Sequence, residues 1–379
     1  MKKNHHIGFN IPHNTGNENR YISQTIISKK FSGNGRFTKK CHQKFTLLLN
    51  NHQNLLTTSC TDALEMSAIL ANISPGDEVI MPTYTFVSTA NAFILRGAKV
   101  KFIDSSTAHP GMDEDKIEEV INEKTKAIVP VHYAGVACDM DKILALANKY
   151  KLLVIEDAAQ AIDSFYKGIP LGSIGDMGCF SFHETKNIQC GEGGLLSINN
   201  SNFSKRAEII WEKGTNRSAF WRGEVDKYNW IDIGSSYLPS EITAAFLYAQ
   251  LEELEKIQEK RKAIWSQYNN GLASLKNLGI GLPNIPKYAT NNAHMFYLIC
   301  RNGNERNQLI EHLKQNNINA VFHYICLHDS PYYIDKHDGR EMPNAKIYEN
   351  CLVRLPLWVN MTDKEVNCVV QKVLEFYEN

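Results

Sequence analysis

Short apolar segments alternate with amphipathic segments along the first two hundred residues. The segment 152–155 is apolar at every position, which is typical of a strand buried on both faces of a sheet. Apolar residues between 63 and 70 recur instead at helical spacing. Strands are expected in this way at 55–58, 78–81, 98–104, 127–132, 152–155, 179–182 and 195–198. Repeated alternation of strand and helix predicts an α/β protein with a mostly parallel sheet covered on both faces.

The rest of the pattern predicts further elements and three parts of the chain. A helix is expected near 113–123, and Ser240 is expected to cap a long helix that runs to residue 268. Beyond that helix we expect strands at 293–299 and 320–324 and a helix at 308–316. The predicted parts are an N-terminal arm (1–30), a large domain (31–250) and a smaller α+β domain (251–379).

Polar side chains follow two of these strands directly. Asp157 and Gln160 come after the strand at 152–155, while Ser181, His183 and Lys186 lie at or beyond the end of the strand at 179–182. Open α/β sheets bind their ligands at the carboxyl ends of the strands. Each residue also has a simpler interpretation, because an aspartate can cap a helix and a lysine can be solvated. Their order and placement together favour a binding site.

Pyridoxal phosphate is a cofactor that needs this set of groups. A lysine amine forms a Schiff base with its aldehyde, and a carboxylate keeps its ring nitrogen protonated so that the ring accepts electrons. These roles fall to Lys186 and Asp157, while Gln160 is expected near the ring hydroxyl and Ser181 at the phosphate. Lys186 is therefore the predicted catalytic residue.

Three motifs give the chain a resemblance to a known family. These are Glu-Asp-Ala-Ala-Gln at 156–160, Phe-Ser-Phe-His-Glu-Thr-Lys-Asn at 180–187 and Gly-Glu-Gly-Gly at 191–194. The sequence resembles the DegT/DnrJ/StrS family of sugar aminotransferases over nearly its whole length. The resemblance implies the fold of type I pyridoxal-phosphate enzymes, with a seven-stranded sheet in the large domain and shared active sites in a homodimer.

The resemblance also implies a reaction. The chain is expected to transfer the amino group of L-glutamate to a dTDP-4-keto-6-deoxyhexose, giving dTDP-4-amino-4,6-dideoxygalactose for a surface polysaccharide such as lipopolysaccharide. Amination at C3 of a dTDP-3-keto-6-deoxyhexose stays open, and so does a non-enzymatic sensor that keeps the fold. Family dehydratases carry histidine at the position of the Schiff-base lysine, and Lys186 argues against that activity.

The remaining site residues are assigned from local pattern and resemblance together. Cys60 and Thr61 begin a helix, and helix N-termini bind phosphate through free N–H groups. Phe86 is expected to stack on the cofactor ring, and Ser236 is expected to reach the cofactor phosphate of a neighbouring subunit. His183 belongs to the same motif as Lys186. The predicted substrate-binding residues are Asn10, His183, Asn216, Arg217, Arg222, His323 and His328.

Alternatives remain open for several of these residues. The 214–230 segment is rich in aromatic and cationic residues, so it could be a loop packed on itself or a contact for a nucleotide diphosphate. His323 and His328 could equally be core or surface histidines.

Composition excludes other function classes. The 379 residues hold 41 Lys and Arg against 41 Asp and Glu, so no net field attracts nucleic acid or a membrane surface. No apolar run approaches the ~20 residues of a membrane helix, and residues 1–6 do not resemble a secretory signal. The nine cysteines lack metal-site spacing. We therefore expect a cytoplasmic protein with reduced thiols and no metal.

Overall fold

The computed structural model describes residues 6–378, and its centre is a sheet in which a single strand runs against the others. The order is β1-β9-β8-β5-β4-β2-β3. Strand β9 is antiparallel to both neighbours, and the remaining pairs are parallel. The strands are β1 (Gln53–Thr57), β2 (Glu78–Pro82), β3 (Lys99–Ile103), β4 (Thr125–Ile128), β5 (Leu153–Asp157), β8 (Met177–Ser181) and β9 (Gly194–Ile198). The predicted mostly parallel, seven-stranded sheet is confirmed.

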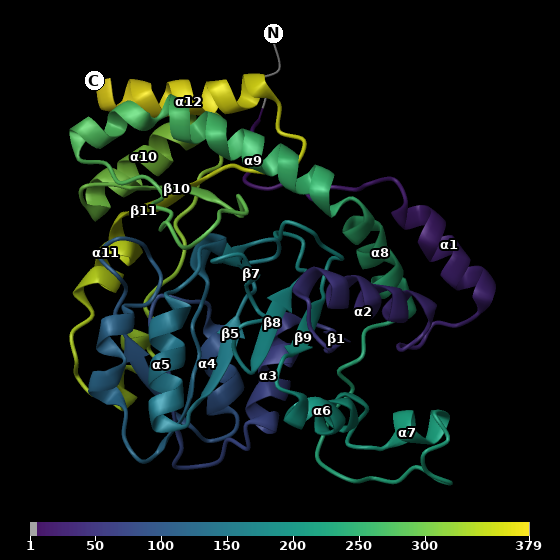
Figure 1. Cartoon of the computed structure of the whole chain (residues 1–379). Coiled ribbons are helices and arrows are strands. Elements are labelled where there is room, and N and C mark those ends of the chain that lie inside the picture. Colours follow the sequence, from purple (N-terminus) through teal and green to yellow (C-terminus); the bar gives the residue numbers. More distant parts are fainter. Residues whose placement is uncertain (1–5, 379) are drawn as a thin grey trace.

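Helices cover both faces of this sheet (Figure 1). Neighbouring residues of β5 contribute to different cores, because Val154 packs with one group of helices and Ile155 with the other. The helices on the Ile155 side are α3 (Cys60–Leu70), α4 (Val87–Ile94) and α6 (Ser204–Trp211). Those on the Val154 side are α2 (Arg36–Leu49), α5 (Met140–Tyr150) and α8 (Glu241–Glu252), with α1 (Glu18–Ser28) lying along α8.

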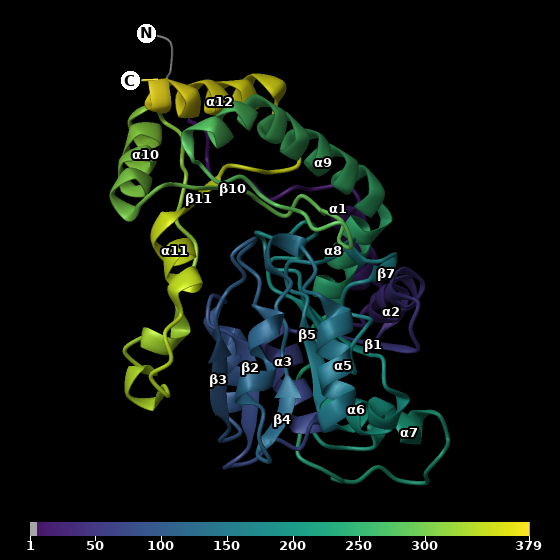
Figure 2. The same ribbon diagram turned by 60° about the vertical axis from the view of Figure 1, so that its left-hand side comes forward.

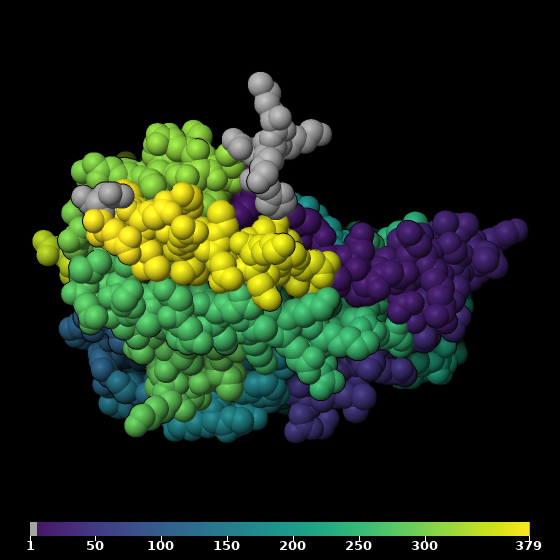
Figure 3. Space-filling model, turned by 90° about the horizontal axis from the view of Figure 1, so that it is seen from above, coloured from purple at the N-terminus to yellow at the C-terminus, as the bar shows by residue number. Residues whose placement is uncertain are grey.

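The C-terminal part of the chain builds a third core of its own. Its elements are α9 (Leu254–Gly271), β10 (Phe296–Ile299), α10 (Gly303–Gln315), β11 (Leu352–Leu355) and α12 (Asp363–Glu378). Figure 3 shows α9 and α12 side by side over the top of the molecule. Ile7 belongs to this core and its N–H donates to the carbonyl of Asn317 (2.9 Å), so the arm begins in the small domain before it crosses to the large one. The domain boundaries predicted from the sequence remain a proposal.

The remaining helices and strands of residues 6–378, apart from 3₁₀ turns, are β6 (Phe165–Tyr166), β7 (Ile169–Pro170), α7 (Arg217–Trp221) and α11 (Pro343–Cys351).

Several predicted elements are wrong in detail. The expected helix at 113–123 is a pair of 3₁₀ turns, η1 (Glu114–Lys116) and η2 (Glu118–Val120), where the Asp113 carboxylate caps the first turn. The expected long helix is two helices, although Ser240 does cap α8 as predicted. Residues 320–324 form no strand, because Val321 pairs with Arg354 only as an isolated bridge. The chain then leaves the sheet, which turns His323 and Tyr324 toward the large domain.

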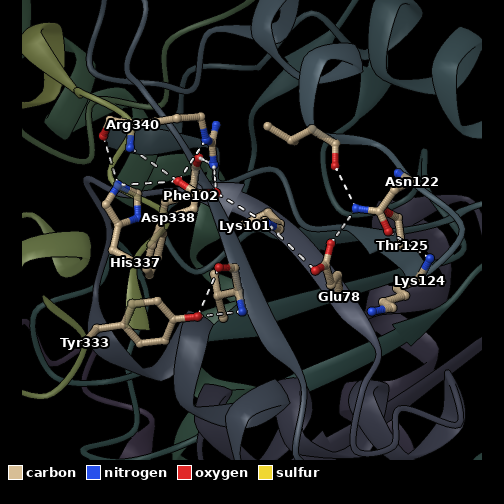
Figure 4. Close-up of polar contacts among 12 residues, drawn as sticks. Glu78, Lys101, Phe102, Asn122, Lys124, Thr125, Tyr333, His337, Asp338 and Arg340 are labelled. Atoms are coloured by element: carbon tan, nitrogen blue, oxygen red, sulfur yellow. Dashed lines mark hydrogen bonds and ion pairs between the residues drawn. The ribbon is translucent and has the colours of Figure 1, made fainter. Parts of the chain in front are cut away.

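One segment of the small domain covers the edge of the sheet that β3 forms. Residues 327–345, which include the start of α11, lie beside the edge strand β3 (Figure 2). The Tyr333 hydroxyl donates to the carbonyl of Val100 (3.0 Å) and accepts from its N–H (2.7 Å). Arg340 donates to the carbonyl of Phe102 (2.9 Å), and Lys101 lies 3.3 Å from the Asp338 carboxylate (Figure 4). The 327–345 segment thus satisfies part of the edge that a bare strand would leave open.

Removing one hydroxyl should show how much this contact stabilises the fold. Tyr333 is 5% exposed, and Tyr333→Phe leaves both backbone groups of buried Val100 without their partner. We expect a loss of about 1–3 kcal/mol in the free energy of unfolding, measured by urea denaturation. Tyr332→Phe is the matched control, because Tyr332 is 59% exposed and keeps its ring under Lys336. Equal midpoints for the two variants would contradict the proposed role of the Tyr333 hydroxyl.

Candidate active site

A cleft of about 450 Å³ lies where the carboxyl ends of the parallel strands meet the small domain. Its walls come from the start of α3, the start of α4, the end of β5, the loop after β8 and four small-domain side chains. The polar and aromatic lining residues are Ser59, Cys60, Thr61, Thr85, Phe86, Ser88, Thr89, Asp157, Gln160, Ser181, His183, Thr185, Lys186, Glu192, His294, His323, Tyr324 and Arg354. A cleft at this edge of the sheet is the place that the sequence pattern predicts.

The Asp157 carboxylate is buried at the end of β5. One oxygen accepts from the Thr89 hydroxyl (2.7 Å) and the other from the N–H of Ala159 (3.1 Å). Thr85 in turn lies 3.0 Å from the Thr89 hydroxyl. Burial raises the pKa of Asp157, and these two hydrogen bonds together with the charge of Lys186 oppose that rise. The carboxylate is therefore held in one orientation and would gain from a cationic partner in the cleft.

Glu156, the residue before Asp157, points away from the cleft and anchors the strand. Its carboxylate accepts from the N–H groups of Gly172 (2.8 Å), Ile174 (2.7 Å) and Gly175 (2.7 Å). His132, which the sequence analysis did not assign to the site, pairs with the same carboxylate at 2.9 Å. Since Glu156 and His132 are both fully buried, this network fixes the end of β5 and with it the position of Asp157.

Lys186 projects from a tight loop between β8 and β9. Its N–H donates to the carbonyl of His183 (2.9 Å). Burial lowers the pKa of the Lys186 amine, Asp157 and Cys60 oppose the shift, and the charge of Arg354 adds to it. A lowered pKa raises the neutral fraction of the amine, which is the form that acts as nucleophile and base.

The next residue locks this loop to the small domain. The Asn187 amide donates to the Gln258 side chain (2.8 Å) and to the carbonyl of Asn292 (2.8 Å), while its oxygen lies 2.8 Å from Nδ1 of His294. The position of Lys186 therefore depends on contacts between the two domains.

The start of α3 provides free N–H groups at the opposite side of the cleft. The Ser59 side chain caps the helix by accepting from the N–H of Asp62 (3.1 Å). The N–H groups of Cys60 and Thr61 lie in the first turn, where an α-helix offers no internal acceptor. Gly194 packs against this turn so closely that a Cβ would come within 2.5 Å of the Cys60 nitrogen. Only glycine allows β9 and the helix start to approach in this way.

Aromatic residues of the small domain close the cleft. Gln160 accepts from the N–H of Ala134 (2.6 Å) and donates to the Tyr324 hydroxyl (2.9 Å). The Tyr324 ring stacks on His323 with centroids 3.5 Å apart, and Nδ1 of His323 lies 2.6 Å from the Tyr133 hydroxyl. Burial lowers the pKa of His323, so the imidazole is neutral. Both the oxygen and the nitrogen of the Gln160 side-chain amide are therefore hydrogen-bonded to the protein.

The structure brings together most of the residues that the sequence analysis assigned to the site. The predicted residues that line the cleft are Cys60, Thr61, Phe86, Asp157, Gln160, Ser181, His183, Lys186 and His323. Phe86 is 57% exposed, so its ring is open to a ligand. The assigned roles of these residues stay proposals.

Six predicted residues lie outside the cleft. His328 is buried and its Nδ1 lies 2.7 Å from the Thr83 hydroxyl, which fits the alternative of a core histidine. Asn10 donates to the carbonyl of Glu184 (3.2 Å) beside the Lys186 loop. The other four are Asn216, Arg217, Arg222 and Ser236, which lie on or near the 214–230 segment.

Several residues of the cleft were not predicted from the sequence, among them Thr89, Tyr324 and Arg354. Thr89 and Tyr324 contact Asp157 and Gln160 across long stretches of chain, and no local pattern marks them. Arg354 had a signal, because it is a lone cation within the otherwise apolar strand β11. Placing a charged side chain in a buried strand costs desolvation free energy, so a charge at such a position indicates a function.

The residues of the cleft fit pyridoxal phosphate. Lys186 offers the amine, the orientation of Asp157 suits a protonated ring nitrogen, and the first turn of α3 with Thr61 and Ser181 offers donors for the phosphate. Among residues 6–378, no group of His, Cys, Asp and Glu could hold a metal ion, and no helix is long and apolar enough to cross a membrane.

Comparison with known proteins gives one consistent result. Residues 12–374 match the family described as DegT/DnrJ/EryC1/StrS aminotransferase family. The chain is 36% identical over 349 residues to the uncharacterized protein MJ1066 of Methanocaldococcus jannaschii, covering 89% of each chain. It is 32% identical to the spore coat polysaccharide biosynthesis protein SpsC of Bacillus subtilis, covering 98% of this chain and 97% of SpsC.

A solved structure agrees over the full length. The putative sugar aminotransferase Spr1654 of Streptococcus pneumoniae, in its PMP-form, superposes with a TM-score of 0.91 at 26% identity, covering 98% of this chain and 99% of that one. The same protein has been solved in a PLP-form, with a TM-score of 0.90.

Neutralising Asp157 should separate its two possible roles. If the carboxylate holds a protonated ring nitrogen, isosteric Asp157→Asn should lower the rate of amino transfer by on the order of 10²-fold or more. The melting temperature should change little, because the Asn oxygen can still accept from the N–H of Ala159 while its NH2 group donates to the Thr89 hydroxyl. A purely structural carboxylate would give the opposite pattern, a lower melting temperature with turnover retained.

Proposed function

This chain belongs to the DegT/DnrJ/EryC1/StrS aminotransferase family, and from that premise we propose that it transfers the amino group of L-glutamate to a dTDP-4-keto-6-deoxyhexose. The product would be dTDP-4-amino-4,6-dideoxygalactose, a nucleotide sugar made in the cytoplasm for a surface polysaccharide. The chain is an aminotransferase and its cofactor is pyridoxal phosphate, as the resemblance implied. The names of SpsC and Spr1654 support a sugar as the amino acceptor.

The juxtaposition of Lys186 and Asp157 in one cleft carries this proposal. They come from different segments of the chain, and each stabilises the charged form of the other: Lys186 lowers the pKa of Asp157, and Asp157 raises the pKa of Lys186. A sensor that only kept the fold would have no use for a desolvated amine facing a buried carboxylate.

Pyridoxal phosphate, when bound, supplies the electrophilic carbon and the electron sink for both half-reactions. Lys186 Nζ takes the proton from the α-carbon of glutamate and returns it to the cofactor side, and its lowered pKa suits that task. Asp157 holds the proton of the ring nitrogen. Gln160 and the stacked pair of Tyr324 and His323 exclude water from that side of the cleft. The keto sugar then accepts the amine by the reverse path.

Product analysis tests the proposed reaction. The purified enzyme is given dTDP-4-keto-6-deoxyglucose and L-glutamate, and the product is identified by mass spectrometry and by NMR of the sugar ring. An axial amine at C4 is the expected result. Amination of the dTDP-3-keto isomer instead would contradict the proposed regiochemistry and favour the C3 alternative.

Replacing the amine of Lys186 should abolish turnover without unfolding the protein. We expect Lys186→Ala to lower amino transfer by on the order of 10³-fold or more, because the residue is both Schiff-base partner and proton carrier. The variant should still bind the cofactor non-covalently, so the absorbance of the lysine-bound form disappears while cofactor stays with the protein. Near-normal turnover in this variant would contradict the assignment of Lys186 as the catalytic residue.

We also propose a homodimer in which the 214–230 segment completes the neighbouring site. Large apolar side chains of this region are exposed, with Trp221 at 70% and Trp230 at 81%. Arg217 and Ser236 line a second hollow of about 350 Å³ that is separate from the cleft of the same chain. Arg222 is already paired with Glu208 and Glu224 (both 2.7 Å), so Arg217 is the better candidate for a nucleotide diphosphate.

Subunit mixing tests whether the sites are shared. Arg217→Ala should weaken use of the nucleotide sugar by roughly tenfold or more while the glutamate half-reaction stays close to normal. Mixing it with Lys186→Ala should restore part of the activity, because one hybrid site then contains both intact residues. Arg222→Ala serves as the comparison. A fully active monomer, or no recovery after demonstrated subunit exchange, would count against shared sites.

A further inference from the structure

Arg354 is a cation that the fold brings into the cleft without a partner of opposite charge among residues 6–378. Its backbone is paired on both sides, in register with Tyr297 of β10 and through an isolated bridge to Val321. The bridge is formed by N–H···O bonds of 2.7 and 3.1 Å. The position of Arg354 is therefore fixed by the sheet, and its side chain lines the same cleft as Lys186 and Asp157.

The guanidinium donors of Arg354 are unused in the part of the chain that the structure describes. Nε is buried and meets no acceptor among residues 6–378, and no carboxylate of those residues lies within ion-pair distance. Arg261, a fully buried arginine, shows how the same fold treats a structural guanidinium. Its Nε and Nη2 donate to the carbonyls of Ala293 (3.1 Å) and His294 (2.7 Å). Arg354 is not satisfied in this way.

The surroundings of Arg354 are aromatic and suit a dry ion pair. The guanidinium lies 4.6 Å from the ring centroid of Phe9, which belongs to the N-terminal arm. Phe9 is held in turn by its carbonyl, which accepts from the N–H of Leu357 (3.3 Å). Burial lowers the pKa of Arg354, and the nearby hydroxyls of Tyr133 and Tyr324 oppose the shift. A guanidinium held partly out of water without a counter-charge is costly, and a ligand carboxylate would reduce that cost.

We propose that Arg354 binds a carboxylate of the amino donor. This rests on the proposed function, in which the donor is an α-amino acid. An α-amino acid places its α-carboxylate one bond from the carbon that must lie at Lys186, and glutamate carries a second carboxylate on its side chain. The planar fork of arginine binds a carboxylate through two parallel hydrogen bonds, which would fix the orientation of the α-carbon. The cofactor phosphate has its own donors at the start of α3.

Binding to the holoenzyme tests this proposal without turnover. Glutarate is a dicarboxylate that has no amine to transfer, and its dissociation constant can be measured by calorimetry. We expect Arg354→Gln to weaken glutarate binding roughly 10–100-fold, as the loss of a charge-assisted hydrogen bond predicts. Arg354→Lys should fall between that variant and the wild type. Arg301→Gln is the control, because Arg301 is an exposed small-domain arginine paired with Glu305 (2.9 Å).

Single-turnover kinetics of the first half-reaction identify which carboxylate is bound. If Arg354 holds the α-carboxylate, Arg354→Gln raises the dissociation constants of L-glutamate and L-glutamine by similar factors. If it holds the side-chain carboxylate, the loss is confined to glutamate. Melting temperatures of Arg354→Gln and Arg354→Lys show whether each variant is folded.

Two results would overturn the proposal. The first is unchanged binding of glutarate and glutamate in a folded Arg354→Gln. The second is a loss confined to the KM for the keto sugar, which would place the sugar nucleotide at Arg354 instead. A wild-type enzyme that reacts with glutamate but with no dTDP-keto-sugar would contradict the proposed function, while the donor measurements would still decide the role of Arg354.

Discussion

Two adjacent carboxylates at the end of β5 are the constraint on which the active-site geometry depends. Strand geometry sends Glu156 and Asp157 to opposite faces of the sheet. Glu156 is fully buried, and three backbone N–H groups and His132 satisfy it. Removing any of these donors would leave a buried charge unsatisfied, so the 172–175 turn and the end of β4 are tied to β5. Asp157 inherits that rigidity and needs few contacts of its own.

The position of the Lys186 loop depends on contacts between the two parts of the chain. Lys186 belongs to the large domain, but the residue after it is bonded to Gln258 of α9 and to the backbone at Asn292. Asn292 in turn donates to the carbonyls of Gln160 and Ile162 (both 2.8 Å), on the loop that follows Asp157. The same few residues thus position the lysine loop, the glutamine and the small domain. The C-terminal part of the chain therefore helps to position the residues of the cleft as well as covering it.

The sequence was sufficient for the parts of this arrangement that are local. Apolar segments gave the seven strands, and the residues at their carboxyl ends gave Asp157, Gln160 and Lys186. A helix end was predictable where one side chain caps it, as at Ser240. The expected helix at 113–123 failed because Asp113 closes a tighter turn, which periodicity does not reveal.

Residues that act across the domain interface could not be placed from local pattern. His323 reaches the cleft only because the chain leaves the sheet after Val321, while His328 turns back to Thr83, the residue just after β2. Tyr324 matters through one hydrogen bond to Gln160, 164 residues away. Such contacts depend on how two domains meet, and that information is not contained in the spacing of residues along either one.

The charges of the cleft connect its two chemical tasks. Asp157 raises the pKa of Lys186 while Arg354 lowers it, so the amine lies between opposing fields. An anionic donor bound at Arg354 would neutralise the second field and leave the first. The pKa of Lys186 would then rise when the donor is in place, and the amine would become a stronger base when an α-carbon is present to lose its proton. On this argument, donor recognition and proton transfer are coupled through charge alone, without movement of the fold.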